Sequence, residues 1–260
     1  MSHMNNIHQS GRQTTAPGFN IYNQPPDYYD ATLSPEYIEQ CFMPIRRLID
    51  SLRKPEGVSI LDLCCGTGVI PDLIRDLGGV SYLGLDLNPT FLDRARERMA
   101  GNEHFTFVEA DLLKHQFDRR FDIVMMINGY HHFENHLKSQ VVKRVHEMLA
   151  PEGSFILYEM CISTYENRDE FAHMVLDFYE KRIEWTRKNE PMTPKKLATW
   201  KNVRDLSVAG EDEYKVDYDY IRKDFHANGF ALKQEIRVWP PENEDLFDDP
   251  RVGDFLFLFE

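Results

Sequence analysis

The chain has 260 residues, of which 42% are hydrophobic and 28% charged, which is ordinary for a globular protein and argues against a disordered or fibrous one. Its formal net charge of −13 argues against a partner held through a phosphate backbone, so we expect no nucleic acid as a ligand. No apolar run approaches the roughly 20 residues that span a bilayer, and the opening residues lack the basic segment and apolar core of a signal peptide, so we expect a cytoplasmic protein without membrane contact.

Four cysteines occur, and two of them, Cys64 and Cys65, are adjacent. Adjacent cysteines cannot form the spaced pair of a structural zinc knuckle, so we interpret all four as free thiols. The first four residues resemble a cloning scar and are followed by a polar stretch without apolar periodicity. We therefore expect residues 1–18 to be disordered and to lie outside the fold.

From residue 58 onward, apolar runs of strand length alternate with stretches of helical spacing. Gly66 and Gly68 interrupt the chain after the first run, and Asn88 with Pro89 signals the start of a helix after the second. The predicted strands are residues 58–63, 81–85, 105–109, 121–127, 154–159, 231–239 and 254–260. Alternation of this kind predicts an α/β fold with a mostly parallel sheet, whose ligands bind at the carboxyl ends of the strands.

The alternation stops between residues 161 and 219. Apolar residues there keep roughly helical spacing within a strongly charged stretch, which predicts a helical cap inserted before the last two strands. A peripheral helix that only packs against the core is the alternative. The alternation resumes near residue 220 with a helix and the two strands that complete the sheet.

The glycines after the first strand allow a sharp turn and a close approach of the backbone to a ligand. Asp86 closes the next strand about 20 positions after Gly66, where a carboxylate can accept two hydrogen bonds from ribose hydroxyls. This spacing does not separate nicotinamide cofactors from S-adenosylmethionine (SAM). Residues 69–71, however, contain no third glycine, so the sequence disfavours a pyrophosphate site.

Residues 61–68, Leu-Asp-Leu-Cys-Cys-Gly-Thr-Gly, resemble the first motif of the class I SAM-dependent methyltransferases. The resemblance covers residues 58–160 well and the last strands more loosely. It implies a Rossmann-like, doubly wound, mostly parallel seven-stranded sheet with an N-terminal lid and an inserted helical cap. The expected division is 1–18 tag scar and disordered N-terminus, 19–57 helical lid, 58–160 SAM-binding core, 161–219 cap and 220–260 completion of the sheet.

The resemblance also assigns the cofactor contacts. It implies that Asp62 lies near the methionine moiety, that Asp86 binds the ribose and that Leu87 lies against the adenine ring. Asp111 would accept from the adenine amino group, and Leu112 would donate its backbone amide. Tyr28 or Tyr29 of the lid would close over the sulfonium or, alternatively, only anchor the N-terminal arm. The predicted cofactor-binding residues are Tyr28, Tyr29, Asp62, Cys64, Gly66, Gly68, Asp86, Leu87, Asp111, Leu112 and Asn128.

The segment after the fourth strand must face the sulfonium in this fold, and it supplies the catalytic candidates Asn128, Tyr130, His131 and His132. Asn128 resembles the residue with which amine methyltransferases of this fold orient the attacking nitrogen, although their intervening prolines are not found here. Tyr130 could stack on the substrate or the sulfonium. Either histidine could act as a general base or only pack against the cofactor loop. We expect no metal site, because Glu134 is the only close carboxylate in the sequence.

Substrate contacts are expected from Tyr158, Glu159, Tyr165 and Trp185. We expect methyl transfer from SAM to a nitrogen or oxygen atom of a small molecule, because the acidic chain and the cap suit a small acceptor. The alternatives are an enzyme that cyclises SAM to azetidine-2-carboxylate and methylthioadenosine, and a SAM-binding regulator without activity. The sequence identifies neither the acceptor nor the pathway, and it leaves open whether the chain forms a homodimer.

Overall fold

A computed structural model describes residues 21–260 of the chain. The predicted tag scar and disordered N-terminus, residues 1–18, lies outside these described residues. Within them, no helix combines the length and the apolar character needed to cross a membrane.

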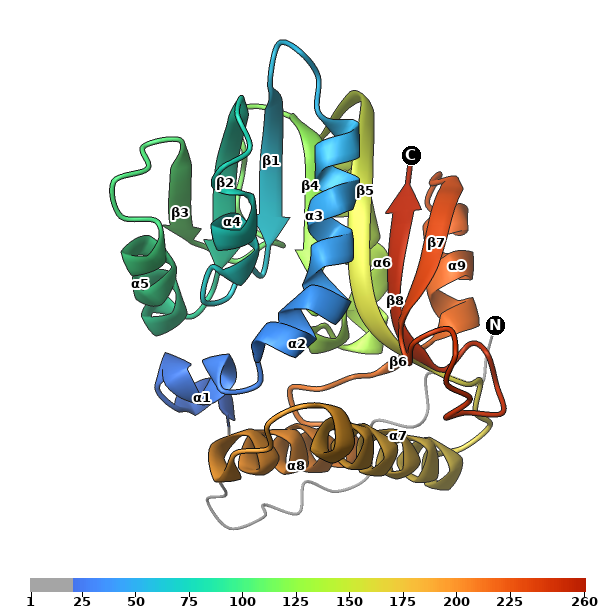
Figure 1. Ribbon diagram of the computed structural model, residues 1–260. Coiled ribbons are helices and arrows are strands. Elements are labelled where there is room, and N and C mark those ends of the chain that lie inside the picture. The colour runs from blue at the N-terminus through green and yellow to red at the C-terminus, as the bar shows by residue number, and fades with distance from the viewer. Residues whose placement is uncertain (1–20) are drawn as a thin grey trace.

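One mixed sheet forms the centre of the molecule (Figure 1). Its strands are β1 Val58–Leu63, β2 Val80–Asp86, β3 Phe105–Glu109, β4 Phe121–Ile127, β5 Leu149–Ile162, β6 Val216–Asp217, β7 Leu232–Trp239 and β8 Gly253–Phe259. Their order is β3-β2-β1-β4-β5-β8-β7, and β6 pairs with β5. β8 runs antiparallel to β5 and β7, while the other pairs are parallel.

The predicted Rossmann-like α/β class is therefore confirmed. The predicted count of seven strands is wrong by one among the described residues, which form eight. The additional strand, β6, has two residues, and a pair of residues is too short to produce a periodic pattern in the sequence.

Helices cover both faces of the sheet and one of its ends (Figure 1). They are α1 Pro26–Asp30, α2 Pro35–Tyr37, α3 Met43–Leu52, α4 Val69–Ile74, α5 Pro89–Arg98, α6 Asn135–Met148, α7 Arg168–Asn189, α8 Pro194–Ala209 and α9 Tyr218–Ala227, with short helical turns η1 Ile21–Asn23, η2 Ile38–Phe42 and η3 Tyr130–His132. α3 and α4 lie on one face, and α6 and α9 lie on the other (Figure 1). Two clusters of buried apolar side chains result, one on each face.

The central strands are buried because both faces are covered. β1 is buried at every position except Ser59, and β8 is buried along its whole length. Parallel strands covered on both faces read as nearly continuous apolar runs, which explains why the sequence located them so closely. The strand before the cap is longer than predicted, since β5 begins at Leu149 and continues to Ile162.

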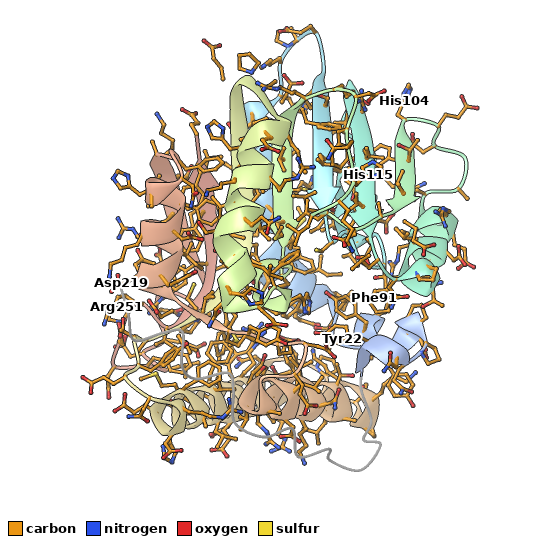
Figure 2. The ribbon with its side chains drawn as sticks, turned by 180° about the vertical axis from the view of Figure 1, so that it is seen from behind. Tyr22, Phe91, His104, His115, Asp219 and Arg251 are labelled. Atoms are coloured by element: carbon orange, nitrogen blue, oxygen red, sulfur yellow. The ribbon has the colours of Figure 1, made fainter. Side chains whose placement is uncertain are left out.

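Helices α7 and α8 lie across the end of the sheet toward which the parallel strands point, and α1 lies beside them (Figure 1). Asn167 starts α7 by accepting a hydrogen bond from the Glu170 amide, and Thr193 starts α8 in the same way. An ion pair of 2.8 Å between Arg251 and Asp219 ties the β7–β8 loop to α9 (Figure 2). Any ligand at the carboxyl ends of the strands is thus enclosed between the sheet, α1 and the two long helices.

Candidate cofactor and acceptor site

The loop after β1 turns sharply over the end of the sheet. Cys64, Gly66 and Gly68 all have positive φ, at 62°, 56° and 77°. A Cβ atom built on Gly66 would meet nothing within 4 Å, so the space beside this residue is open. A Cβ on Gly68 would lie 2.7 Å from the Ala95 side chain, so Gly68 allows the loop to pack on α5. The two glycines therefore serve different purposes, and only Gly66 borders free space.

Asp86 fixes the end of β2 beside this loop. Its Oδ2 accepts from the Gly66 amide and its Oδ1 accepts from the Asn88 amide, both at 2.8 Å. The next residue, Leu87, is 67% exposed, an unusual state for a large apolar side chain in this fold. A nucleoside would give the Leu87 side chain an apolar partner and Asp86 the ribose hydroxyls, so these two residues fit the cofactor.

Asp62 lies below the loop and is 1% exposed. Its Oδ2 accepts from the Tyr82 hydroxyl at 2.6 Å, but its buried Oδ1 has no hydrogen-bond partner among the described residues. Burial raises the pKa of Asp62 to about 7. The ammonium group of the methionine moiety of SAM would satisfy this oxygen, so Asp62 also fits SAM.

Asp111 and Leu112 follow β3, which pairs with β2. The Leu113 amide donates to Asp111 Oδ1 at 2.9 Å, and Lys114 lies 2.7 Å from Oδ2 and lowers the pKa of Asp111. The side chain of Leu112 is buried in the same cluster as Leu85. Asp111 is thus a hydrogen-bond acceptor at the strand end adjoining Asp86, and its assignment to the adenine amino group stays a prediction.

The two lid tyrosines point to different places. Tyr29 lines the cavities described below, where burial raises the pKa of its hydroxyl far above the usual range. Tyr28 does not line them: its carbonyl accepts from Thr199, and its ring lies 4.5 Å from the Lys195 ammonium. The prediction that Tyr28 contacts the cofactor is therefore not supported by the geometry, because α8 holds this side chain.

The cofactor loop borders one of two adjoining cavities. The first, which we call the cofactor cavity, is lined by Tyr29, Phe42, Asp62, Cys64, Cys65, Gly66, Thr67, Val69, Ile70 and Ile127. The second, the acceptor cavity, offers about 710 Å³ with its open mouth included. Tyr29 and Phe42 line both, so the cavities meet at these rings.

Asn128 adjoins both cavities along the chain. It follows Ile127, which lines the cofactor cavity, and is itself one of the residues that line the acceptor cavity. Its backbone has a positive φ of 53°, and its amide donates to the Tyr158 carbonyl at 2.8 Å. The following Gly129 allows close packing, since a Cβ there would lie 3.0 Å from the Cys64 Cβ. The ends of β1 and β4 are therefore pressed together where the two cavities meet.

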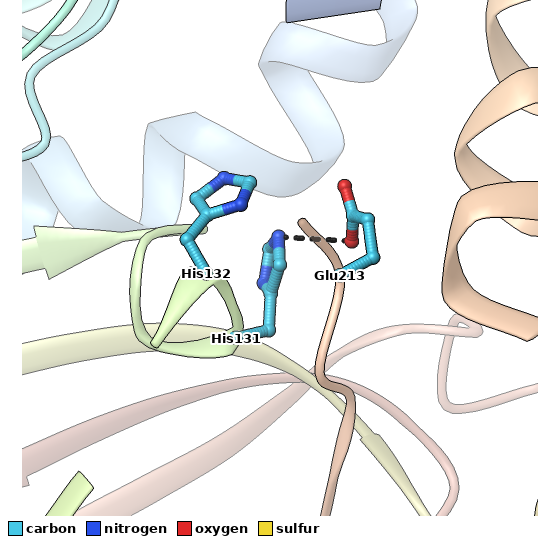
Figure 3. Close-up of side chains that lie close together, drawn as sticks. All are labelled: His131, His132 and Glu213. Atoms are coloured by element: carbon cyan, nitrogen blue, oxygen red, sulfur yellow. Dashed lines mark ion pairs between the residues drawn. The ribbon is translucent and has the colours of Figure 1, made fainter. Parts of the chain in front are cut away.

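The two histidines predicted from the sequence lie together, with different partners (Figure 3). His131 Nδ1 lies 2.5 Å from Glu159 Oε1, and the His131 amide donates to Glu159 Oε2 at 3.1 Å. Its Nε2 lies 3.3 Å from Glu213 Oε2. His132 Nδ1 lies 2.8 Å from the Asp212 carbonyl oxygen. Glu159 was expected to contact substrate, but its full burial behind His131 makes it a support for that ring.

Glu213 is the functional candidate that sequence reasoning missed. It is fully buried, the Tyr22 hydroxyl donates to it, and Lys215 Nζ forms an ion pair with it at 2.5 Å. Burial alone would raise the pKa of Glu213, but Lys215 and His131 lower it to about 2. Burial and Lys215 in turn hold the pKa of His131 well below its usual range. No sequence pattern pairs residue 213 with residue 131, because Glu213 lies near the end of the cap, far along the chain from the histidines.

The expectation that Glu134 is the only carboxylate near the histidines is wrong. Glu134 points to the exposed His136, 3.3 Å away, whereas Glu213 approaches His131 and His132 from the segment after α8. Tyr22 also reaches this group, with its ring centroid 5.0 Å from that of His132, and it lies where the cap meets the sheet (Figure 2).

Tyr130 is not beside the cofactor. Its hydroxyl donates to Asp224 at 2.7 Å and its ring packs on Phe225, in the cluster covered by α9. The predicted stacking on substrate or sulfonium is therefore wrong for this residue. The turn η3 sends consecutive side chains in different directions, so that His131 faces the acceptor cavity while Tyr130 faces away.

Three of the predicted substrate contacts also pack elsewhere. Tyr158 is fully buried, donates to Asp254 at 3.1 Å and packs its ring on Phe42. The ring of Tyr165 packs on Phe171, and Trp185 packs on Trp239. None of these three lines the acceptor cavity, because each completes the apolar core between the sheet and the cap.

A buried arginine lies in the wall of the acceptor cavity instead. Arg182 is 1% exposed, pairs with Asp254 at 2.9 Å and lies 4.1 Å from the Trp239 ring centroid. The remaining wall is largely aromatic, with Tyr37, Phe178, Tyr179 and Trp200 beside the rings already named. The cavity thus combines balanced buried charges with faces that suit a small, partly apolar or cationic molecule.

The chain is similar in sequence to known methyltransferases. The family described as a methyltransferase domain matches residues 60–153. The phosphoethanolamine N-methyltransferase of Plasmodium falciparum is 24% identical over 132 residues, 50% of each chain, and the demethylmenaquinone methyltransferase of Lactococcus lactis is 29% identical over 138 residues, 51% of this chain and 50% of that one. The chain thus spans about half the length of these curated relatives.

Among solved structures, the SAM-dependent methyltransferase of Mesorhizobium loti has a TM-score of 0.55 at 19% identity, with 82% of this chain and 95% of that chain covered. At this identity the likeness concerns the fold. The identity of the cofactor is indicated by the family match, together with the glycine loop and the carboxylates at the ends of β1 to β3. Residues 60–153 thus form a methyltransferase domain of the class I SAM-dependent kind, and SAM is its cofactor.

Proposed function

We propose that the protein transfers the methyl group of SAM to a nitrogen or oxygen atom of a small molecule held in the acceptor cavity. The observation that carries this proposal is the position of Asn128, which lines the acceptor cavity directly after Ile127 of the cofactor cavity. A nucleophile in the acceptor cavity beside Asn128 would approach the cofactor at the carboxyl ends of the parallel strands. Catalysis would then come mainly from positioning and from the exclusion of water.

The residues around the two cavities have different parts in this scheme. SAM supplies the electrophilic methyl group when it is bound. Asp62 and Asp86 hold the methionine and ribose ends, and the Asn128 amide oxygen accepts from the attacking group and aims its lone pair. The proton that the acceptor loses goes to His131 or His132, which line the same cavity.

The residues around the site form the enclosure. Asp30 of α1 accepts from Thr67 of the glycine loop at 2.7 Å, and Lys196 of α8 pairs with Glu190 beneath the lid. We propose that the described part of the predicted lid, residues 21–57, and the cap, residues 161–219, together admit only a small acceptor. The relatives named above carry small-molecule acceptors in their names, which supports this size limit.

The test is mass spectrometry of the purified protein with SAM and a panel of small amines, alcohols and phenols. We expect S-adenosylhomocysteine to form together with one acceptor whose mass rises by a methyl group. A parallel incubation with SAM alone examines the alternatives: enzyme-dependent methylthioadenosine with azetidine-2-carboxylate would replace the proposal by SAM cyclisation. Tight SAM binding without any product across the panel would favour a regulator.

A further inference from the structure

Two histidines and one glutamate converge beside the acceptor cavity. His131, His132 and Glu213 each present one atom able to bind a metal, and these atoms lie within 4.8 Å of one another (Figure 3). The histidines come from the turn after β4, and the glutamate comes from the segment between α8 and β6. The fold therefore assembles a set that the sequence does not show.

A hydrogen-bond partner at Nδ1 fixes the orientation of each imidazole ring. His131 Nδ1 lies 2.5 Å from Glu159, which also accepts from the backbone amides of His131 and Met160. Two backbone amides donate to Glu159, which suits an ionised carboxylate, and such a carboxylate would accept the ring proton of His131 from Nδ1. His132 Nδ1 donates to the Asp212 carbonyl at 2.8 Å. In both rings Nε2 keeps its lone pair, and a carboxylate or carbonyl behind Nδ1 is the usual support of a metal-binding histidine.

The distance between two of the atoms that would bind the ion is also suitable. His131 Nε2 and Glu213 Oε2 are 3.3 Å apart, close to the roughly 3.4 Å that separates two ligands of a tetrahedral ion with bonds of about 2.0–2.1 Å. Both atoms are acceptors, so their approach is unfavourable unless a cation or a proton lies between them. Glu213 Oε2 is buried and lies 2.5 Å from the Lys215 ammonium, in a geometry that makes no well-aligned hydrogen bond.

We propose that His131, His132 and Glu213 bind one divalent transition-metal ion, such as Zn²⁺ or Co²⁺, at the wall of the acceptor cavity. Two imidazoles and a carboxylate suit these ions and leave coordination positions open. All three residues line the acceptor cavity. If the methyl transfer proposed above is right, the bound ion replaces the histidines as the group that promotes loss of the acceptor's proton: an oxygen or nitrogen atom of the acceptor takes an open position and its proton leaves to water. The binding of the ion itself does not depend on that reaction.

Lys215 opposes this ion. Its ammonium pairs with Glu213 at 2.5 Å, outside hydrogen-bonding geometry, and already neutralises the carboxylate. A bound ion must displace the ammonium, and the neighbouring Tyr179 hydroxyl offers it another partner. The affinity is therefore set by competition between two cations for one carboxylate, and removing the ammonium should strengthen metal binding.

The experiment uses chelator-treated full-length protein without SAM or any acceptor. Co²⁺ is added and the visible absorption is recorded, and Zn²⁺ binding is measured by calorimetry. We expect one equivalent of each ion. His132→Ala and Glu213→Gln should weaken Zn²⁺ binding at least about tenfold, and Glu159→Gln, behind the site, about 10–100-fold. Lys215→Met should strengthen it several-fold.

His136→Ala is the matched control, because this histidine is exposed and pairs with Glu134, which is not one of the proposed ligands. It should bind Zn²⁺ like the unaltered protein, and circular dichroism shows whether each variant is folded. Absence of saturable binding in the unaltered protein, or equal affinity in the folded variants and the control, would overturn the proposal and assign the position between His131 and Glu213 to a proton. Because no SAM is present, a failed methyl-transfer assay has no bearing on this result.

Discussion

The Tyr82 hydroxyl donates to one oxygen of Asp62 at 2.6 Å, while the other oxygen of this buried carboxylate has no partner among the described residues. The pair lies beneath the glycine loop, with Asp62 on β1 and Tyr82 on the neighbouring β2. Tyr82 thus orients Asp62, a residue that lines the cofactor cavity, and leaves one of its oxygens as an available acceptor.

SAM affinity should depend on pH through Asp62. Burial raises the pKa of Asp62 to about 7, so the ionised fraction in the free protein falls from about one half at pH 7 to about one tenth at pH 6. An ammonium group prefers the ionised form, and the dissociation constant should rise several-fold over this interval. Calorimetry at both pH values measures it, and Asp62→Asn should bind more weakly and lose most of the dependence. A dependence that persists unchanged in Asp62→Asn would remove Asp62 as its source.

The same pKa shift affects folding. The raised pKa means that the folded protein holds a proton more tightly than the unfolded chain, so this contribution to stability is complete below about pH 3.9 and is lost as the pH rises through 7. Asp62→Asn should therefore flatten part of the decrease in unfolding free energy between pH 4 and pH 7. Urea titrations at several pH values test this, and curves parallel to those of the unaltered protein would contradict it.

Replacing Asp86 by alanine should weaken SAM binding at least about tenfold, since each hydrogen bond to a charged group contributes about 1.5–3 kcal/mol. The variant also loses the bonds from the Gly66 and Asn88 amides that hold the loop. Asp93→Ala on the exposed face of α5 is the control and should bind normally. Unchanged affinity in Asp86→Ala would remove the ribose assignment.

Gly68→Ala should destabilise the protein more than Gly101→Ala. Both glycines have positive φ, which costs an alanine about 1–2 kcal/mol. Only at Gly68 would the new methyl group also collide with Ala95, at 2.7 Å, adding about 1–3 kcal/mol of overpacking. Denaturant unfolding of the two variants isolates the packing contribution, and equal losses would show that the α5 contact is unimportant.

The strands could be predicted, and the carboxylates proposed for the cofactor could be placed at the strand ends, because these signals are local. The run 58–63 is apolar since it is buried on both faces, and Asp86 is recognisable from its spacing to Gly66. The partner of His131 could not be predicted, because Glu213 reaches it only after the cap has folded back over the sheet. The orientation of Tyr130 was equally hidden, since the direction of a side chain in a short turn depends on the packing around it.

Lid attachment should also influence SAM binding. Asp30 joins α1 to the glycine loop through Thr67 and to α5 through Arg98, at 2.7 and 2.6 Å. Asp30→Ala should make the lid more susceptible to limited proteolysis and reduce SAM affinity several-fold. Asp50→Ala, which breaks only an ion pair with Arg53 at the end of α3, is the control. Equal cleavage rates in the two variants would show that Asp30 does not hold the lid.

Asn128→Gly tests the central claim most directly, because glycine tolerates the positive φ of this residue and the substitution removes only the amide side chain. Once an acceptor is known, kcat and the dissociation constant of SAM are measured for both proteins. Aiming of the nucleophile by Asn128 predicts a fall in kcat of at least about tenfold with SAM affinity changed less than about twofold. Weaker SAM binding with an unchanged kcat would contradict the account and reduce Asn128 to a cofactor contact.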